Sequence, residues 1–172
     1  DFGFPLSLFV DRFTLTDFTL KQQDTEQQLN ALHFSLQWQK QQLEILQLEA
    51  NHSQLSVQGS AQLTTGHAYP LQAELQIQLT DGEFSGQHLQ LNVSGDLSAI
   101  QLQADASGQV NASLNAAANL LQPALPHRLQ LQSEQLQWPA TTEQPRLRLS
   151  RTNLVLEGDL ARSHFNGHTS IK

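Results

Sequence analysis

The chain contains no cysteine and no methionine among its 172 residues. Without cysteine it has no disulfide framework, no thiolate metal site and no cysteine nucleophile. A complete translation product begins with methionine, whereas this sequence begins with Asp1. We therefore expect an internal fragment or a processed product of a longer protein.

Positive charge, aromatic side chains and long apolar runs are also scarce. The nine Lys and Arg residues are scattered, apart from Arg146, Arg148 and Arg151, and the net charge is −7. Nucleic acid demands a basic stripe, so we do not expect it as a partner. No apolar run approaches the ~20 residues that span a bilayer, and no signal peptide is visible. Any targeting segment is expected outside this sequence.

The sequence is instead rich in glutamine, and its apolar and polar residues alternate with a period of two. Its 26 Gln residues mean that uncharged amides supply most of the polarity. From Leu71 to Thr80, apolar and polar residues alternate without error. This period indicates a β-strand with one dry and one wet face, whereas a helix would place Leu on every side. The pattern outweighs the helix propensity of Leu, Gln and Glu.

The same alternation recurs along the chain and predicts roughly a dozen strands in an all-β fold. Alternating segments include 6–8 with 13–15, 32–38, 55–57, 89–93, 100–106, 110–116, 129–131, 147–149 and 154–156. Turn signals separate them, among them Asp24-Thr25, Thr65-Gly66-His67, Asp81-Gly82, Gly95-Asp96 and Gly158-Asp159. Residues 115–127, which contain two prolines, are expected to form a strand end and then a loop. No helical pattern recurs between strands, so the chain should form a serial antiparallel meander.

A loose internal repeat links two of the predicted strand ends. Residues 91–97 align with residues 154–160 as an alternating strand followed by Gly-Asp-Leu. The glycine relieves the backbone at a bend before the return strand. A third copy at 55–60 keeps only the strand and the glycine, and the spacing is irregular. A propeller or a fixed-period solenoid is therefore not expected.

No arrangement of residues predicts catalysis. His164 and His168 form the one close histidine pair, and on a strand they would lie ~13 Å apart, too far to share a metal ion. The carboxylates at 81 and 83, and those at 157 and 159, sit beside glycines in turns, where they are usually solvated. No nucleophile elbow, phosphate-binding loop or zinc-binding helix motif occurs. The sequence predicts neither an enzyme nor a metal or cofactor site.

Several features together resemble a known family. They are the alternating strands without Met, the repeated strand-Gly-Asp-Leu unit, and the stretch 125–131 that runs on to Leu136-Gln137-Trp138-Pro139. The chain resembles a segment of the TamB family, the inner-membrane-anchored component of the translocation and assembly module, or of its AsmA-like relatives.

The resemblance implies a periplasmic β-structure, folded as an open, twisted, taco-like hydrophobic groove that bridges the inner and outer membranes. Residues 1–172 would form a single groove segment, with the inner-membrane anchor outside them. The implied cargo is phospholipid, carried by its acyl chains in support of outer-membrane biogenesis, with an outer-membrane assembly partner for the full-length protein. The working part would be the inward residues of the strands: Leu55, Val57, Leu71, Leu75, Ile77, Leu79, Leu89, Leu91, Val93, Leu102, Leu114, Leu129, Leu131, Leu147 and Leu149.

Alternation alone also fits a closed β-sandwich with these residues as its core. A lined groove is favoured because the phenylalanines gather near the start of the chain, at Phe2, Phe4, Phe9, Phe13 and Phe18. Two other functions stay open. The strands could form a scaffold that binds outer-membrane or autotransporter proteins by strand addition at its edges, or a structural secreted module with a closed core.

Overall fold

A computed structural model of the chain describes residues 7–22, 25–66, 68–138 and 146–171. Within these ranges the chain consists of β-strands and their connecting loops and turns, without a helix. The strands are β1 (Leu8–Gln22), β2 (Thr25–Gln39), β3 (Gln42–His52), β4 (Leu55–Thr64), β5 (Leu71–Leu79), β6 (His88–Gly95), β7 (Ile100–Ser107), β8 (Asn111–Ala118), β9 (His127–Trp138), β10 (Leu147–Gly158) and β11 (Ser163–Ile171).

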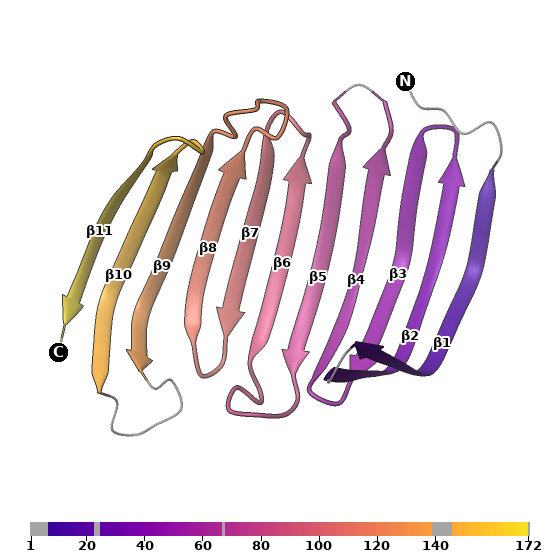
Figure 1. The fold of residues 1–172 in the computed structure, drawn as a ribbon, viewed down its shortest axis with the longest axis horizontal. Helices are drawn as coiled ribbons and strands as arrows, with labels where there is room; N and C mark the ends of the chain where they lie inside the picture. The colour runs from indigo at the N-terminus through magenta and orange to yellow at the C-terminus, as the bar shows by residue number, and fades with distance from the viewer. Residues whose placement is uncertain (1–6, 23–24, 67, 139–145, 172) are drawn as a thin grey trace.

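All eleven strands belong to one sheet, and their order in space is their order in the chain (Figure 1). Each strand pairs antiparallel with its neighbours in sequence, which confirms the predicted serial meander. The predicted turns at 65–66, 81–82, 95–96 and 158–159 fall at or just after strand ends, whereas Asp24 and His67 lie outside the described residues. The proline-containing stretch 119–126 is the loop between β8 and β9.

The burial of β5 follows the alternation of its sequence. Its apolar residues are half-buried and its polar residues are exposed, without exception from Leu71 to Leu79. A two-residue period puts successive side chains on opposite faces of the sheet. The apolar side chains therefore share one face of this strand, and the Gln and Glu side chains share the other.

The sheet is open and has no closed core. Among the described residues no hydrophobic side chain is fully shielded from water, and the buried residues are Gln87, Ser133 and Thr152. A β-sandwich would bury large aliphatic side chains between its two layers. The alternative of a closed β-sandwich is therefore wrong, and the open form is confirmed.

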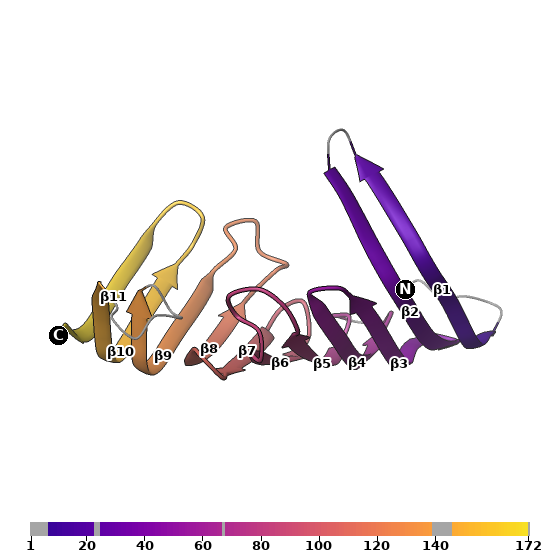
Figure 2. The same cartoon turned by 90° about the horizontal axis from the view of Figure 1, so that it is seen from below.

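Bends are placed towards the two ends of the sheet. The pairing register shifts between neighbouring strands from β1 to β4, and again between β8 and β9 and between β10 and β11. From β4 to β8 the register is unbroken. A β-bulge bends and twists its strand, and the β1–β2 hairpin and the loop after β10 rise on the same side of the sheet (Figure 2).

The loops form two rims along the long sides of the sheet (Figure 1). We call the loops after the even-numbered strands the first rim, at 40–41, 65–70, 96–99, 119–126 and 159–162. The loops after β3, β5 and β7, at 53–54, 80–87 and 108–110, belong to the second rim. On the first rim, backbone hydrogen bonds of 2.6–2.9 Å run from loop to loop: Thr65 N–H to Gln41 O, Leu97 N–H to Ala68 O, Leu120 N–H to Leu97 O and Leu160 N–H to Ala124 O.

On the second rim, a backbone hydrogen bond of 2.9 Å runs from Thr80 N–H to Gln54 O, and a side chain joins the next two loops. The amide of Gln87 donates to Val110 O over 2.7 Å, and Val110 N–H donates back to the Gln87 side-chain oxygen over 2.9 Å. Gln87 is 4% exposed, so these bonds satisfy polar groups that water does not reach. The buried side-chain amide of Gln87 thus supplies the hydrogen-bond partners of the β7–β8 turn, in place of the backbone of a neighbouring strand.

Candidate functional site: the apolar face

Directly opposed apolar residues form continuous rows across the sheet. One row crosses every strand, because each member lies opposite the next in the pairing register. It consists of Phe13, Phe34, Leu48, Gly59, Leu75, Leu91, Ala104, Leu114, Leu131, Leu154 and Gly167. We call the surface that carries this row the apolar face.

The structure places all the predicted lining residues on the apolar face. The pairs Leu63–Leu71, Val57–Ile77 and Leu55–Leu79 join β4 to β5, and corresponding pairs continue to β10. These side chains are half-buried, except that Leu147 is 41% exposed. Their gathering on one face follows from the register, whereas their contact with lipid stays a prediction.

Matched bulges in β9 and β10 keep the apolar face continuous at the C-terminal end of the sheet. In the pairing of β9 with β8, β9 has one extra residue between Ser133 and Gln135. In the pairing of β10 with β11, β10 has one extra residue around Arg151, whose φ is 52°. A one-residue slip in a single strand would turn its leucines to the other face. Because both strands carry the extra residue, Leu149 still lies opposite Leu136.

The apolar face is wider than the predicted set. Phe13 and Phe34 extend it at the N-terminal end, where their rings stack with centroids 4.7 Å apart. Leu154 and Leu156 extend it on β10, opposite Leu131 and Leu129. All four extending residues lie in alternating segments of the sequence, so their periodicity was the signal that could have identified them.

The glycines of the apolar row make room for leucines. The repeat at 55–60 predicted Gly59 at a bend before a return strand, which is wrong, because Gly59 lies inside β4. A Cβ added at Gly59 would lie 2.6 Å from Leu75 Cδ2 and would also meet the backbone oxygen of Glu74. A Cβ at Gly167 would lie 2.8 Å from Leu154 Cδ2. Hydrophobic alternation does not flag a glycine, since its contribution is the missing side chain.

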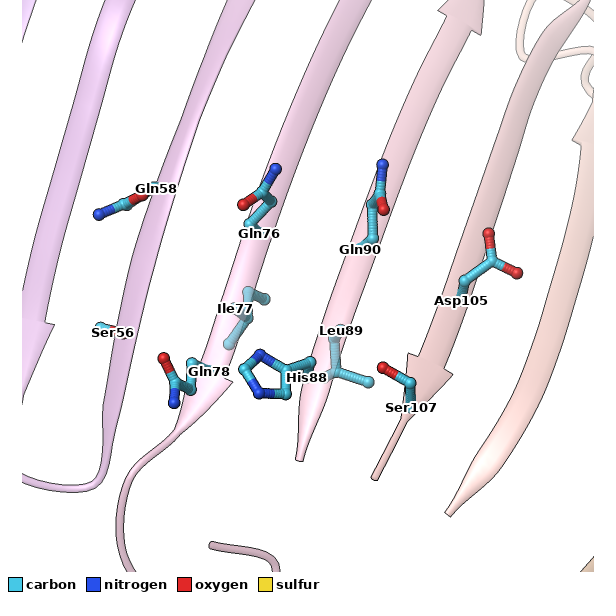
Figure 3. Close-up of a pocket in the computed structure, with 10 residues that line it drawn as sticks. All are labelled: Ser56, Gln58, Gln76, Ile77, Gln78, His88, Leu89, Gln90, Asp105 and Ser107. Carbon is cyan, nitrogen blue, oxygen red and sulfur yellow. The ribbon is translucent and has the colours of Figure 1, made fainter. Parts of the chain in front are cut away.

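The opposite surface, the polar face, carries a matching row of hydrophilic residues. It crosses every strand as Thr14, His33, Glu49, Gln58, Gln76, Gln90, Asp105, Ser113, Gln132, Asn153 and His168. Figure 3 shows Gln58, Gln76 and Gln90 side by side around a shallow hollow of about 340 Å³, with Ile77 and Leu89 pointing to the other side. Ser113 donates a hydrogen bond of 2.6 Å to Asp105 at its margin. Elsewhere in the row, the Thr14 hydroxyl and the His33 ring nitrogen Nδ1 lie 3.1 Å apart, so neighbouring polar side chains hydrogen-bond across the strands.

The repeated Gly-Asp unit builds the turns of the first rim. Asp96 accepts hydrogen bonds from the backbone N–H groups of Ser98 and Ala99, over 2.7 and 3.1 Å, and from the Ser98 hydroxyl. Asp159 accepts from the N–H groups of Ala161 and Arg162, both over 2.8 Å. These bonds favour the ionised carboxylate and lower the pKa of both side chains. Gly95 has φ 105°, a conformation that suits glycine.

The described residues offer little for other chemistry. Nowhere among them do three His, Asp or Glu side chains gather to hold a metal ion. The same part of the chain has no apolar helix of membrane-spanning length. The distinctive surface of the molecule is therefore its uncovered apolar face.

Comparison with known proteins identifies the family of the chain. No solved structure matches the chain. A family model described as the N-terminal domain of TamB matches residues 1–172, the whole of the sequence. The open all-β sheet, the serial strands and this match lead to one assignment: the chain belongs to the TamB family.

Proposed function

We propose that the apolar face shields phospholipid acyl chains while the lipid travels through the periplasm between the inner and outer membranes. Membership of the TamB family gives the chain a TamB-type role in outer-membrane assembly. The family is not a known enzyme family and provides a transport or assembly component. The cargo and the residues that contact it are what the proposal adds.

The observation that carries the proposal is a continuous apolar surface that the described chain leaves uncovered. Soluble proteins rarely expose contiguous apolar patches of more than a few hundred Å², and larger ones mark binding sites. Here the apolar row continues through eleven strands, and no second layer packs on it within the described residues. Strands stack ~4.8 Å apart, so this surface is about 50 Å long.

The chemistry of the surface suits an acyl chain. Carrying a chain of roughly 16 carbons through water costs on the order of 12 kcal/mol, because each exposed CH₂ costs ~0.8 kcal/mol. Leu, Ile, Val and Ala dominate the rows from β4 to β8, and none of their positions is charged. A lining of this kind shields any acyl chain without recognising its details.

The test is a photo-crosslinking amino acid at Leu75 in the full-length protein, with the same amino acid at Gln76 as the matched control. The two residues are adjacent on β5 but lie on opposite faces. Position 75 should capture phospholipid and position 76 should not. Equal capture at both positions would refute the proposal.

A second function is favoured by the free edges of the sheet. Within the described residues, β1 and β11 each pair on one side only, and an unpaired edge can accept a further strand from a substrate protein. A proline at a β11 position whose N–H points away from β10 should then abolish binding of an outer-membrane β-protein substrate, while lipid capture at position 75 persists. Unchanged substrate binding would exclude this scaffold role for β11.

A further inference from the structure

The charges of the chain are separated along the sheet. Residues 41–127, which form β3 to β8 and their loops, contain seven Asp and Glu and no Lys or Arg. The net charge of this span equals the net charge of the whole chain, −7. The described cations lie in the flanking strands and turns, outside the central half of the apolar face.

Carboxylates stand on both rims beside the middle of the apolar face. Asp81 and Glu83 are exposed in the loop between β5 and β6, on the second rim. Asp96 lies in the turn between β6 and β7, on the first rim. Hydrogen bonds from Ser98 and Ala99 lower the pKa of Asp96, so this carboxylate is ionised at neutral pH.

The cation nearest to Asp96 is Arg128 on β9, whose side chain lies on the polar face and forms an ion pair of 3.1 Å with Glu157. The other cations near the rims lie towards the ends of the sheet. Lys40 is in the turn after β2, and Arg162 is in the turn after β10, both on the first rim. Arg146 precedes β10 at the side of the second rim. A headgroup beside the middle strands therefore faces negative charge from both rims.

We propose that the apolar face between β3 and β8 takes lipids with zwitterionic headgroups in preference to anionic ones. The inference rests on the proposed function, because it concerns the headgroup of a lipid whose acyl chains lie on this face. Such a lipid holds its headgroup at the open side, between the two rims. An anionic headgroup is repelled by the three rim carboxylates, whereas a zwitterionic headgroup carries an ammonium that offsets this repulsion.

The size of the preference for zwitterionic lipid depends on the salt concentration, because the repulsion is electrostatic. The eight or nine residues of β5, β6 and β7 separate the rims by roughly 26–30 Å, so a headgroup midway between them lies about 13 Å from the carboxylates. At this distance in water, anionic lipid should be depleted about threefold at 0.01 M salt and about 1.4-fold at 0.15 M. At 1 M salt the Debye length falls to about 3 Å, and the depletion should vanish. A preference based on headgroup shape would not depend on salt in this way.

The experiment uses the full-length protein with a photo-crosslinking amino acid at Leu91, a member of the apolar row on β6. The protein is exposed to vesicles of equal parts phosphatidylethanolamine and phosphatidylglycerol, and mass spectrometry measures the ratio of the captured lipids. The double substitution Asp81→Asn with Glu83→Gln should reduce the threefold depletion at low salt to about 1.4-fold. The matched control Glu134→Gln removes an exposed carboxylate on β9, outside the central span, and should leave the ratio unchanged.

The outcomes separate this inference from the function on which it rests. Capture of both lipids in equal amounts at low salt would overturn the headgroup preference and leave the acyl-chain function standing. A depletion that persists in the double variant would also overturn it, since the rim carboxylates would not be its cause. Capture of neither lipid would refute the proposed function itself.

Discussion

Replacing Leu75 by arginine distinguishes an open apolar face from a packed core. Leu75 lies on β5 between Gly59 and Leu91, its partners on β4 and β6, and it is half-buried. Full burial of a leucine contributes about 2 kcal/mol, so the substitution should cost about 1 kcal/mol of folding free energy. The arginine stem can lie along the sheet with its guanidinium in water. In a closed core, the unpaired cation would cost several kcal/mol.

The same substitution should strongly impair lipid capture. A guanidinium in the path of an acyl chain must be desolvated or displaced, and we expect capture at position 91 to fall about tenfold. The assay combines urea unfolding of the purified protein with photo-crosslinking, and Gln76→Arg on the polar face is the control. Global unfolding of Leu75→Arg, or lipid capture equal to that of Gln76→Arg, would refute the reasoning.

Three further predictions concern an aspartate in the turns of the first rim, a glycine of the apolar row and a glutamine of the second rim. The lowered pKa of Asp96 means that its ionised form stabilises the fold above the ordinary pKa of 3.8, and that this stability is lost as the pH falls through the lower folded value. Asp96→Ala should therefore lower the melting temperature more at pH 7 than at pH 3. Gly59→Ala should cost about 1–3 kcal/mol in urea unfolding, because the new Cβ would meet the Glu74 backbone oxygen. Gln87→Ala should cost about 2–3 kcal/mol and speed hydrogen exchange at the Val110 amide, since it removes the partner of the part-buried N–H and C=O groups of Val110.

Matched substitutions make these predictions specific. Gly66→Ala should cost less than Gly59→Ala, because its Cβ would meet only the flexible side chains of Gln41 and Thr64, with Gln41 nearest at 3.2 Å. Gln90→Ala should change stability little, since Gln90 is exposed on the polar face. If Gln87→Ala cost no more than Gln90→Ala, the buried amide would not hold the second rim. An Asp96→Ala effect of equal size at both pH values would exclude the ionised carboxylate as its source.

The periodicity of the sequence was sufficient to predict the strands and the apolar face. Residues 71–79 form β5 because a two-residue period has one structural meaning, and cross-strand pairing then collects the apolar side chains on one surface. The choice between a groove and a sandwich could not be made from this pattern, because both bury the same residues by the same alternation. The near absence of buried side chains in the described chain decided it.

The bulges and the rim contacts could not be predicted. Arg151 has an ordinary position in the sequence pattern, and only the register of its neighbours reveals that it accommodates an extra residue. Gln87 is one of many glutamines, and its burial depends on a turn that lies 23 residues away. Long-range pairing determines both features, so local propensity gives no signal for them.

The strict chain order of the strands has a consequence for how such a molecule can change its length. Each strand contacts substantially only its two neighbours, so the sheet behaves as a row of hairpins and not as a single nucleus. Inserting or deleting one hairpin changes the length by about 10 Å and returns the chain to the same rim. A single inserted strand would instead reverse the direction of every strand after it and exchange the loops of the two rims. Evolution can therefore adjust the reach of this architecture in steps of two strands, while the chemistry of each face stays unchanged.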